Sequence, residues 1–119
     1  MKLGIILDNL GLPLNDAIAA AGRLGVRGVQ VYAVDGVFSP AHMTRDKLED
    51  ILSRMESYGL EFSALCGDFG GHGFQDAQAN PERIECTKKI LHLAKLLGTD
   101  IVTTHIGIIP ESSDDGVYD

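Results

Sequence analysis

Three stretches of the chain repeat the same order of apolar and polar positions. In each stretch apolar residues first recur every three or four positions, a glycine follows, and a short run rich in Val, Ile, Phe and Thr comes next. Apolar residues at every third or fourth position are typical of a helix with one buried face, and a short run of Val, Ile, Phe and Thr is typical of a strand. The glycines are Gly25, Gly59 and Gly98, and glycine favours the left-handed backbone just past a helix end. The pattern therefore predicts helices that are followed directly by strands.

The same pattern predicts where the elements begin and end. We expect helices over 14–24, 45–58 and 81–97, and strands over 2–7, 28–34, 61–66 and 100–105. Thr44 and Asn80 are expected to cap the second and third helices, and Pro81 suits a first helical position. The apolar residues expected to face a core are Leu14, Ala17, Ile18, Ala21 and Leu24, then Leu48, Ile51, Leu52 and Met55, then Ile84, Leu91, Ala94 and Leu97. Strands that alternate with helices predict a parallel sheet with right-handed crossovers.

Ligands of such sheets bind where the strands end. The segments in question are 8–13, 35–43, 67–79 and 106–119. Three of the four histidines, His42, His72 and His105, fall in these segments or at their edge. The fourth, His92, lies within the third predicted helix near Lys88 and Lys95, so we expect it to be solvated.

Two parallel folds are compatible with this order, an open sheet covered on both faces and a (βα)8 barrel. An open sheet tends toward continuous apolar strands, whereas a barrel strand has one face against helices and one toward a partly polar interior. In the second predicted strand Val29 and Val31 alternate with Gln30 and Tyr32. This alternation favours the barrel, of which four strands would be half, because a complete barrel needs about 250 residues.

Composition narrows the class of protein. The chain has 119 residues with 45% hydrophobic and 23% charged residues, which indicates one globular unit. Its net charge is −7 and it has no basic cluster, so nucleic acid is not an expected partner. No apolar run approaches the roughly 18 residues of a membrane span. Cys66 and Cys86 match no metal or redox spacing, and we interpret them as reduced thiols of a cytoplasmic protein.

Four stretches, "LGIILDNLG", "GVQVYAV", "SALCGDFGGHGF" and "IVTTHIGIIPE", resemble the sugar phosphate isomerase/epimerase family. These are the xylose isomerase-like TIM barrels, to which endonuclease IV is also related. The resemblance covers nearly the whole chain, and its most specific piece is "TTHIGIIPE". It implies an α/β fold in which residues 1–119 form a single partial domain, the first half of a TIM barrel that ends after strand four. It also implies an enzyme that isomerises or epimerises a sugar or sugar phosphate by metal-assisted proton transfer.

The resemblance implies one divalent metal, Mn, Mg, Co or Zn, held by Glu, Asp, His and Glu of later strands. Because residue 119 precedes any fifth strand, we expect no metal ligand and no certain catalytic residue in this chain, and a metal only in a full-length protein. Either the chain is the amino-terminal half of a longer protein, or it is a non-catalytic half-barrel that forms a homo-oligomer with a second copy. A third interpretation is an endonuclease IV-like phosphodiesterase, in which His72 and His105 would be the one available metal pair. The acidic balance disfavours it.

The predicted partner is a small-molecule sugar, and His105 is the leading residue to bind it. An imidazole at the pocket rim donates a hydrogen bond to a sugar hydroxyl or carbonyl oxygen. Alternatively, the ring bonds a loop carbonyl and holds the turn at Gly107. Cys66 ends the third predicted strand and faces either the pocket or the core; no neighbouring base makes it a nucleophile.

Four further residues are candidates for contacts with the sugar, each with a structural alternative. His72 lies in a glycine-rich loop that is either part of the site or only flexible. Asp8 ends the first predicted strand, where it either touches the substrate or forms a turn. Tyr32 either lines the interior or packs. Glu111 follows "HIGIIP" and either contacts the ligand or is solvated.

Overall fold

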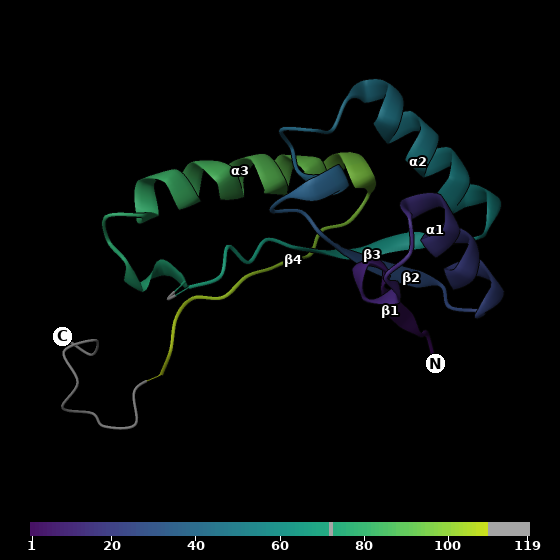
Figure 1. The fold of residues 1–119 in the computed structure, drawn as a ribbon, viewed down its shortest axis with the longest axis horizontal. Coiled ribbons are helices and arrows are strands. Elements are labelled where there is room, and N and C mark those ends of the chain that lie inside the picture. The colour runs from purple at the N-terminus through teal and green to yellow at the C-terminus, as the bar shows by residue number, and fades with distance from the viewer. Residues whose placement is uncertain (72, 110–119) are drawn as a thin grey trace.

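The computed structural model of the protein describes residues 1–71 and 73–109. Within them, parallel strands and helices alternate along the chain (Figure 1). The strands lie in the order β1-β2-β3-β4 and span Gly4–Ile6, Gly28–Tyr32, Glu61–Cys66 and Val102–Thr103. The α-helices are α1 (Leu14–Arg23), α2 (Arg45–Ser57) and α3 (Asn80–Leu97). Three single-turn 3-10 helices are η1 (Leu7–Leu10), η2 (Gly36–Phe38) and η3 (Gly73–Gln75). The predicted alternation is confirmed.

One face of the sheet carries the hydrophobic core. Val29 and Val31 of β2 and Leu65 of β3 are fully buried and belong to one apolar cluster. The same cluster contains residues of all three helices, among them Ile18 of α1 and Met55 of α2. The helices therefore pack on the face to which these strand residues point, which is the barrel arrangement. In the described part of the chain, none of the three α-helices covers the opposite face of the sheet.

The other face carries the opposite set of strand positions. A register shift lets Val29 pair with Phe62 but Gln30 with Ala64, so that Ser63 is an extra residue in β3. Beyond the shift, Tyr32 pairs with Cys66. Cys66 pairs in turn with Thr103 of β4. Gln30 Nε2 donates to Thr103 Oγ1 at 3.3 Å, reaching across β3. This row of polar and small side chains is the partly polar interior that the alternation in β2 predicts.

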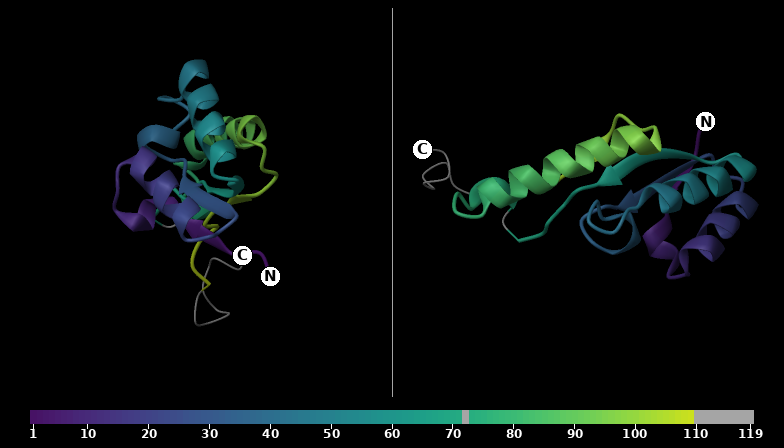
Figure 2. Two further views of the ribbon diagram at one scale, coloured as in Figure 1. Left: turned by 90° about the vertical axis from the view of Figure 1, so that its right-hand side faces the viewer. Right: turned by 90° about the horizontal axis from the view of Figure 1, so that it is seen from above.

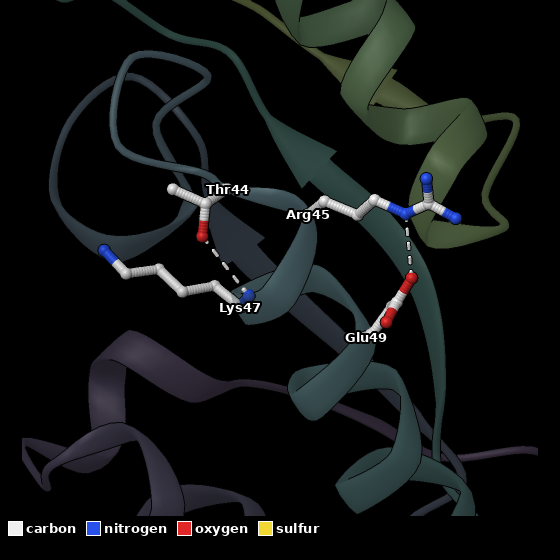
Figure 3. A network of polar contacts seen from close by, with 4 residues as sticks. All are labelled: Thr44, Arg45, Lys47 and Glu49. Carbon is white, nitrogen blue, oxygen red and sulfur yellow. Dashed lines mark hydrogen bonds and ion pairs between the residues drawn. The ribbon is translucent and has the colours of Figure 1, made fainter.

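Helix ends follow the local sequence signals closely. Thr44 caps α2 as predicted, because its Oγ1 accepts a hydrogen bond from the Lys47 N–H at 3.3 Å (Figure 3). The next residue, Arg45, forms an ion pair with Glu49 at 2.9 Å across one helical turn. The predicted glycines just past the helices have φ values of 73°, 67° and 82° at Gly25, Gly59 and Gly98. No helix in the described ranges is both long and apolar enough to cross a membrane.

Asn80 is not the cap of α3, contrary to the prediction. It lies inside the helix, and its side chain donates to the Phe74 carbonyl at 2.9 Å. The preceding turn is closed by Asp76, whose carboxylate accepts from the backbone N–H groups of Gln78 and Ala79. The Asx turn at Asp76 thus orders the residues that lead into α3, and no side chain in the described residues caps this helix.

Three residues expected in the core are exposed. Leu24 lies just past the end of α1, and Ile84 and Leu91 of α3 are 46% and 50% exposed. The buried stripe of α3 is instead Ile90, Leu93, Ala94 and Leu97. These positions follow one another at i, i+3, i+4 and i+7, which is the spacing of a single helix face. His92 is exposed, as predicted.

The outer strands are shorter than predicted. β1 has three residues instead of six, and β4 has two instead of six. Within the described residues each of them pairs on one side only, with β2 and β3 respectively. A strand with one partner has half the ladder hydrogen bonds of a central strand, so its ends are less well defined.

Candidate functional site

The carboxyl ends of the strands place four of the six predicted site residues along one edge of the sheet. Asp8 lies in η1 directly after β1, and Tyr32 is the last residue of β2. Cys66 is the last residue of β3, and His105 comes two residues after β4. Because the strands are parallel, these ends share one edge, where ligands of such folds bind.

Asp8 and Tyr32 are in direct contact. The Oδ2 atom of Asp8 accepts a hydrogen bond from the backbone N–H of Tyr32 at 3.0 Å. This bond ties the turn after β1 to the end of β2. The other oxygen, Oδ1, has no hydrogen-bond partner within the described residues and is available to a ligand.

A small cavity of about 160 Å³ opens beside this contact. Its wall comes from η1, the start of α1, the end of β2 and η2, and includes buried apolar residues such as Leu7 and Phe38. Two carboxylates, those of Asp8 and Asp35, line it together with Tyr32. Asp35 was not among the predicted site residues, although it lies in the segment 35–43 that follows β2. Such a wall offers oxygen acceptors to hydroxyl groups, together with apolar side chains.

Tyr32, Cys66 and Thr103 form one row across the inner face, because they are partners in successive strand pairs. The Cys66 thiol is free and half-buried. Its carbonyl oxygen accepts from the Ala33 N–H at 2.9 Å, which continues the contact between β2 and β3 past the strand ends. Because Cys66 pairs with Tyr32 and Thr103 in the row on the inner face, its register is compatible with a side chain that faces the pocket.

His105 lies beyond the row, in the segment that leaves β4. It is half-buried, and its imidazole makes no hydrogen bond within residues 1–71 and 73–109. The structural alternative, a ring bonded to a loop carbonyl, has no counterpart there. His105 is not part of the wall of the cavity at Asp8. Gly107 has a φ of 146°, but the turn expected there is not present, since residues 104–109 contain no turn.

Two predicted site residues, His72 and Glu111, lie outside the described residues. Among the described residues, no three His, Cys, Asp or Glu side chains converge on a point that could hold a metal ion. The divalent metal that the sequence resemblance implies therefore has no ligand set in this part of the molecule, and we assign no chemical step to it here.

The charge at this edge of the sheet is acidic. Across all 119 residues, no Lys or Arg occurs in β1 to β4 or in the segments that follow them, 7–13, 33–44, 67–79 and 104–119. The basic residues in the first turns of α2 and α3 are engaged, whereas Lys89 of α3 lines a second cavity with Ala33 and Phe69, which lie after β2 and β3. Arg45 pairs with Glu49, Lys47 Nζ donates to the His42 carbonyl at 3.2 Å, and Arg83 donates to two loop carbonyls.

Two solved structures share this arrangement of elements. A xylose isomerase domain protein from Planctomyces limnophilus matches with a TM-score of 0.72 and 24% identity, over 98% of this chain and 45% of that one. A protein from Sinorhizobium meliloti 1021 matches with a TM-score of 0.61 and 19% identity, over 96% of this chain and 39% of that one. The chain thus spans less than half the length of either structure. At these identities the likeness shows the fold, which is that of the first half of a TIM barrel.

No curated protein matches the chain. A family model does: the model described as "Xylose isomerase-like TIM barrel" matches residues 18–119, which is most of the sequence. That family includes sugar isomerases and epimerases as well as endonuclease IV-like enzymes. The sequence match and the barrel-type sheet agree, and the chain belongs to the xylose isomerase-like TIM barrel family.

Proposed function

We propose that this chain supplies one half of the pocket of a sugar isomerase or epimerase, and that the part of the sugar it meets is uncharged. The observation that carries the proposal is the make-up of the carboxyl edge of the sheet. It presents carboxylate, phenol, thiol and imidazole groups from Asp8, Tyr32, Cys66 and His105, and neither the strands nor the segments that follow them contain Lys or Arg. These groups suit the hydroxyls of an open-chain sugar.

The absence of basic residues bears on phosphorylated substrates. Proteins bind phosphate through Arg, Lys, backbone N–H groups and helix N-termini, and a carboxylate nearby opposes binding. The cavity beside Asp8 has two carboxylates in its wall and no basic side chain. A phosphate placed there would meet repulsion, whereas a hydroxyl would donate to the free oxygen of Asp8. A phosphodiester substrate is disfavoured on the same ground.

In this proposal the residues of the chain bind and orient the sugar. Asp8 and Asp35 accept hydrogen bonds from hydroxyls, and Tyr32 lines the same cavity. His105 donates to a hydroxyl or carbonyl oxygen from the rim. Orientation of this kind supplies part of the rate of a proton transfer between adjacent carbons. We assign the transfer itself to no residue of this chain.

The proposal is tested with matched pairs of sugars. The full-length enzyme, in which this chain forms one half of the barrel, is incubated with Mn²⁺ or Mg²⁺ and with neutral aldoses and ketoses, each beside its terminal phosphate ester. Proton NMR follows conversion between aldose and ketose or between epimers. We expect conversion of a neutral sugar, with the phosphate ester at least about 10-fold slower, since a lost or repulsive contact of about 1.4 kcal/mol gives that factor.

Three outcomes would contradict the proposal. Turnover of the phosphate ester at an equal or higher rate would remove the inference of an uncharged contact. No conversion of any sugar in the panel would remove the isomerase and epimerase assignment. Cleavage of a DNA duplex at an abasic site would replace it with the phosphodiesterase branch.

A further inference from the structure

The side chain of Gln75 is hydrogen-bonded to both backbone groups of Ile108. Gln75 Nε2 donates to the Ile108 carbonyl at 2.9 Å, and Gln75 Oε1 accepts from the Ile108 N–H at 3.0 Å. A primary amide has the same donor and acceptor as a peptide unit, so it takes the place of a neighbouring strand. The two residues are 33 positions apart, so this contact joins the segment after β3 to the segment after β4.

Two glycines let these segments approach closely. A Cβ on Gly73 would lie 2.5 Å from the His105 carbonyl oxygen and 2.7 Å from the Gly107 nitrogen. A Cβ on Gly107 would overlap the Gln75 side chain. Both glycines also have positive φ, 61° and 146°, which other residues rarely adopt. Beside them the Phe74 N–H donates to the Ile106 carbonyl at 3.1 Å.

The loop that carries Gln75 is itself fixed to α3. Arg83 Nη1 donates to the carbonyls of Gly70 and Gly73 at 3.2 and 2.6 Å, and Asn80 Nδ2 donates to the Phe74 carbonyl. Figure 1 and the right-hand view of Figure 2 show the segment after β3 running beside α3 toward the end at which the helix begins. The segment after β4 leaves the sheet in the same direction (Figure 1). The support for Gln75 thus comes from a helix and not from another free loop.

From these contacts we infer that Gln75 is a positioning residue for His105. Since β4 has only two residues, the sheet gives little support to a residue that lies two positions beyond it. The contacts that follow, at Ile106 and Ile108, come from Phe74 and Gln75. His105 is therefore anchored on the carboxyl side by the loop after β3. The catalytic meaning of this anchor rests on the proposed function, but the anchor itself can be measured without a substrate.

The first test removes the amide. In Gln75→Ala we expect the amide hydrogen of Ile108 to exchange with solvent about 3- to 10-fold faster, as one neutral hydrogen bond is lost. The ring signals of His105 in a carbon–proton NMR spectrum should shift or broaden, while those of His92 stay in place. Gln78→Ala is the matched control, because the side chain of Gln78 has no partner in the described ranges. It should leave all these signals unchanged.

The second test makes the anchor depend on pH. In Gln75→Glu the neutral carboxylic acid can donate to the Ile108 carbonyl and accept from its N–H, as the amide does. Ionisation removes the donor and places negative charge beside that carbonyl. We expect the carbonyl carbon of Ile108 and the signals of 105–107 to titrate with the same midpoint as the carboxyl carbon of Glu at position 75. Gln78→Glu should show no such coupling. This variant also serves if Gln75→Ala does not fold.

The outcomes separate the anchor from the proposed function. Unchanged His105 signals in Gln75→Ala, equal changes in Gln78→Ala, or no coupled titration in Gln75→Glu would each overturn the role of Gln75. If the anchor holds, sugar turnover by the full-length enzyme should fall in Gln75→Ala, and the double variant with His105→Asn should be no slower than His105→Asn alone. Additive losses would show that Gln75 does not act through His105. A failed sugar assay with intact NMR effects would refute the proposed function and leave the anchor standing.

Discussion

The carboxylate of Asp8 is shared between the framework and the cavity. One oxygen accepts the Tyr32 N–H at 3.0 Å, and the other has no partner among the described residues. The residue therefore does two separable things: it joins the turn after β1 to the end of β2, and it presents negative charge to a ligand.

Two substitutions at Asp8 should separate these roles. Asp8→Ala removes the acceptor, and we expect the free energy of unfolding to fall by about 1–2 kcal/mol. Asp8→Asn keeps a carbonyl acceptor and should lose less than about 1 kcal/mol. Urea unfolding of the chain measures both. Asp35→Ala is the control, because Asp35 lines the same cavity but has no hydrogen-bond partner in the described part, and it should leave stability within about 0.5 kcal/mol. Equal losses in Asp8→Ala and Asp35→Ala would contradict the assignment.

The two faces of α3 give a prediction within one helix and one residue type. Leu93 is 3% exposed and Leu91 is 50% exposed. Leu93→Ala should lower the free energy of unfolding by about 2–5 kcal/mol, because it leaves a cavity in the core. Leu91→Ala should cost less than about 1 kcal/mol. Thermal or urea unfolding of the two variants measures this difference. A larger loss of unfolding free energy in Leu91→Ala than in Leu93→Ala would support the buried face of α3 that was predicted from the sequence.

Thr44 is the N-cap of α2, with its hydroxyl on the Lys47 N–H. Replacing it with Ala should destabilise the chain by about 0.5–2 kcal/mol, because that N–H loses its acceptor. Thr44→Ser keeps the hydroxyl and serves as the control, with little change expected. Circular dichroism during urea unfolding is a sufficient measurement. A neutral Thr44→Ala variant would mean that water replaces the cap without loss.

His105 and His92 offer a matched pair for activity. If His105 orients the sugar, His105→Asn in the full-length enzyme should lower kcat/KM by about 10- to 1000-fold, which is roughly 1.4–4 kcal/mol of transition-state stabilisation. The free energy of unfolding should change by less than about 1 kcal/mol. His92→Asn, on the exposed face of α3, should change neither quantity. Normal turnover combined with a lower melting temperature in His105→Asn would remove this residue from the site.

Metal binding by the chain itself can be measured directly. We expect calorimetry with Mn²⁺ or Mg²⁺ to give no stoichiometric binding at low micromolar concentration, because hard cations need several converging oxygen ligands. Among the described residues, no three His, Cys, Asp or Glu side chains lie together in a way that could hold a metal ion. Tight binding would contradict this and direct attention to Asp8, Asp68 and Glu111. The alanine variants of these three residues would then identify the ligands.

The parts of the fold that the sequence predicts correctly depend on near neighbours. The alternation of strands and helices, the cap at Thr44 and the glycines after the helices each rest on residues within one or two turns. The face of α3 depends on what the helix packs against. Ile84 and Leu91 belong to a second apolar row that short-range spacing cannot distinguish from the buried one. Packing against the sheet selects the row that contains Ile90 and Leu93.

The candidate site also has parts that local sequence patterns predict and parts that depend on distant contacts. The positions of Asp8 and Cys66 at strand ends follow from the order of elements and were predicted, whereas Tyr32, expected inside a strand over 28–34, is the last residue of β2. The contact of Asp8 with the Tyr32 N–H spans 24 positions, and that of Gln75 with Ile108 spans 33. Nothing in the local pattern around Gln75 marks it, since its partner is a backbone group of a distant segment. Asp35 had one usable signal, its place before Gly36 in a loop after a strand, and composition alone does not rank it above other loop aspartates.

The extra residue in β3 affects which changes in chain length the strand can tolerate. Phe62 and Leu65 both face the helices although three positions separate them, and this is possible only because Ser63 is accommodated outside the regular pairing. Losing Ser63 would keep Leu65 toward the helices and Cys66 on the opposite face, at the cost of the bonds from Ser63 Oγ to the Val29 carbonyl and from Thr99 to the Ser63 carbonyl. Adding a residue between Ala64 and Leu65 would turn Leu65 away from the helices and Cys66 toward them, because successive strand residues point to opposite faces. Within this strand, the gain of one residue is therefore more damaging than the loss of one, provided that the residue lost is Ser63.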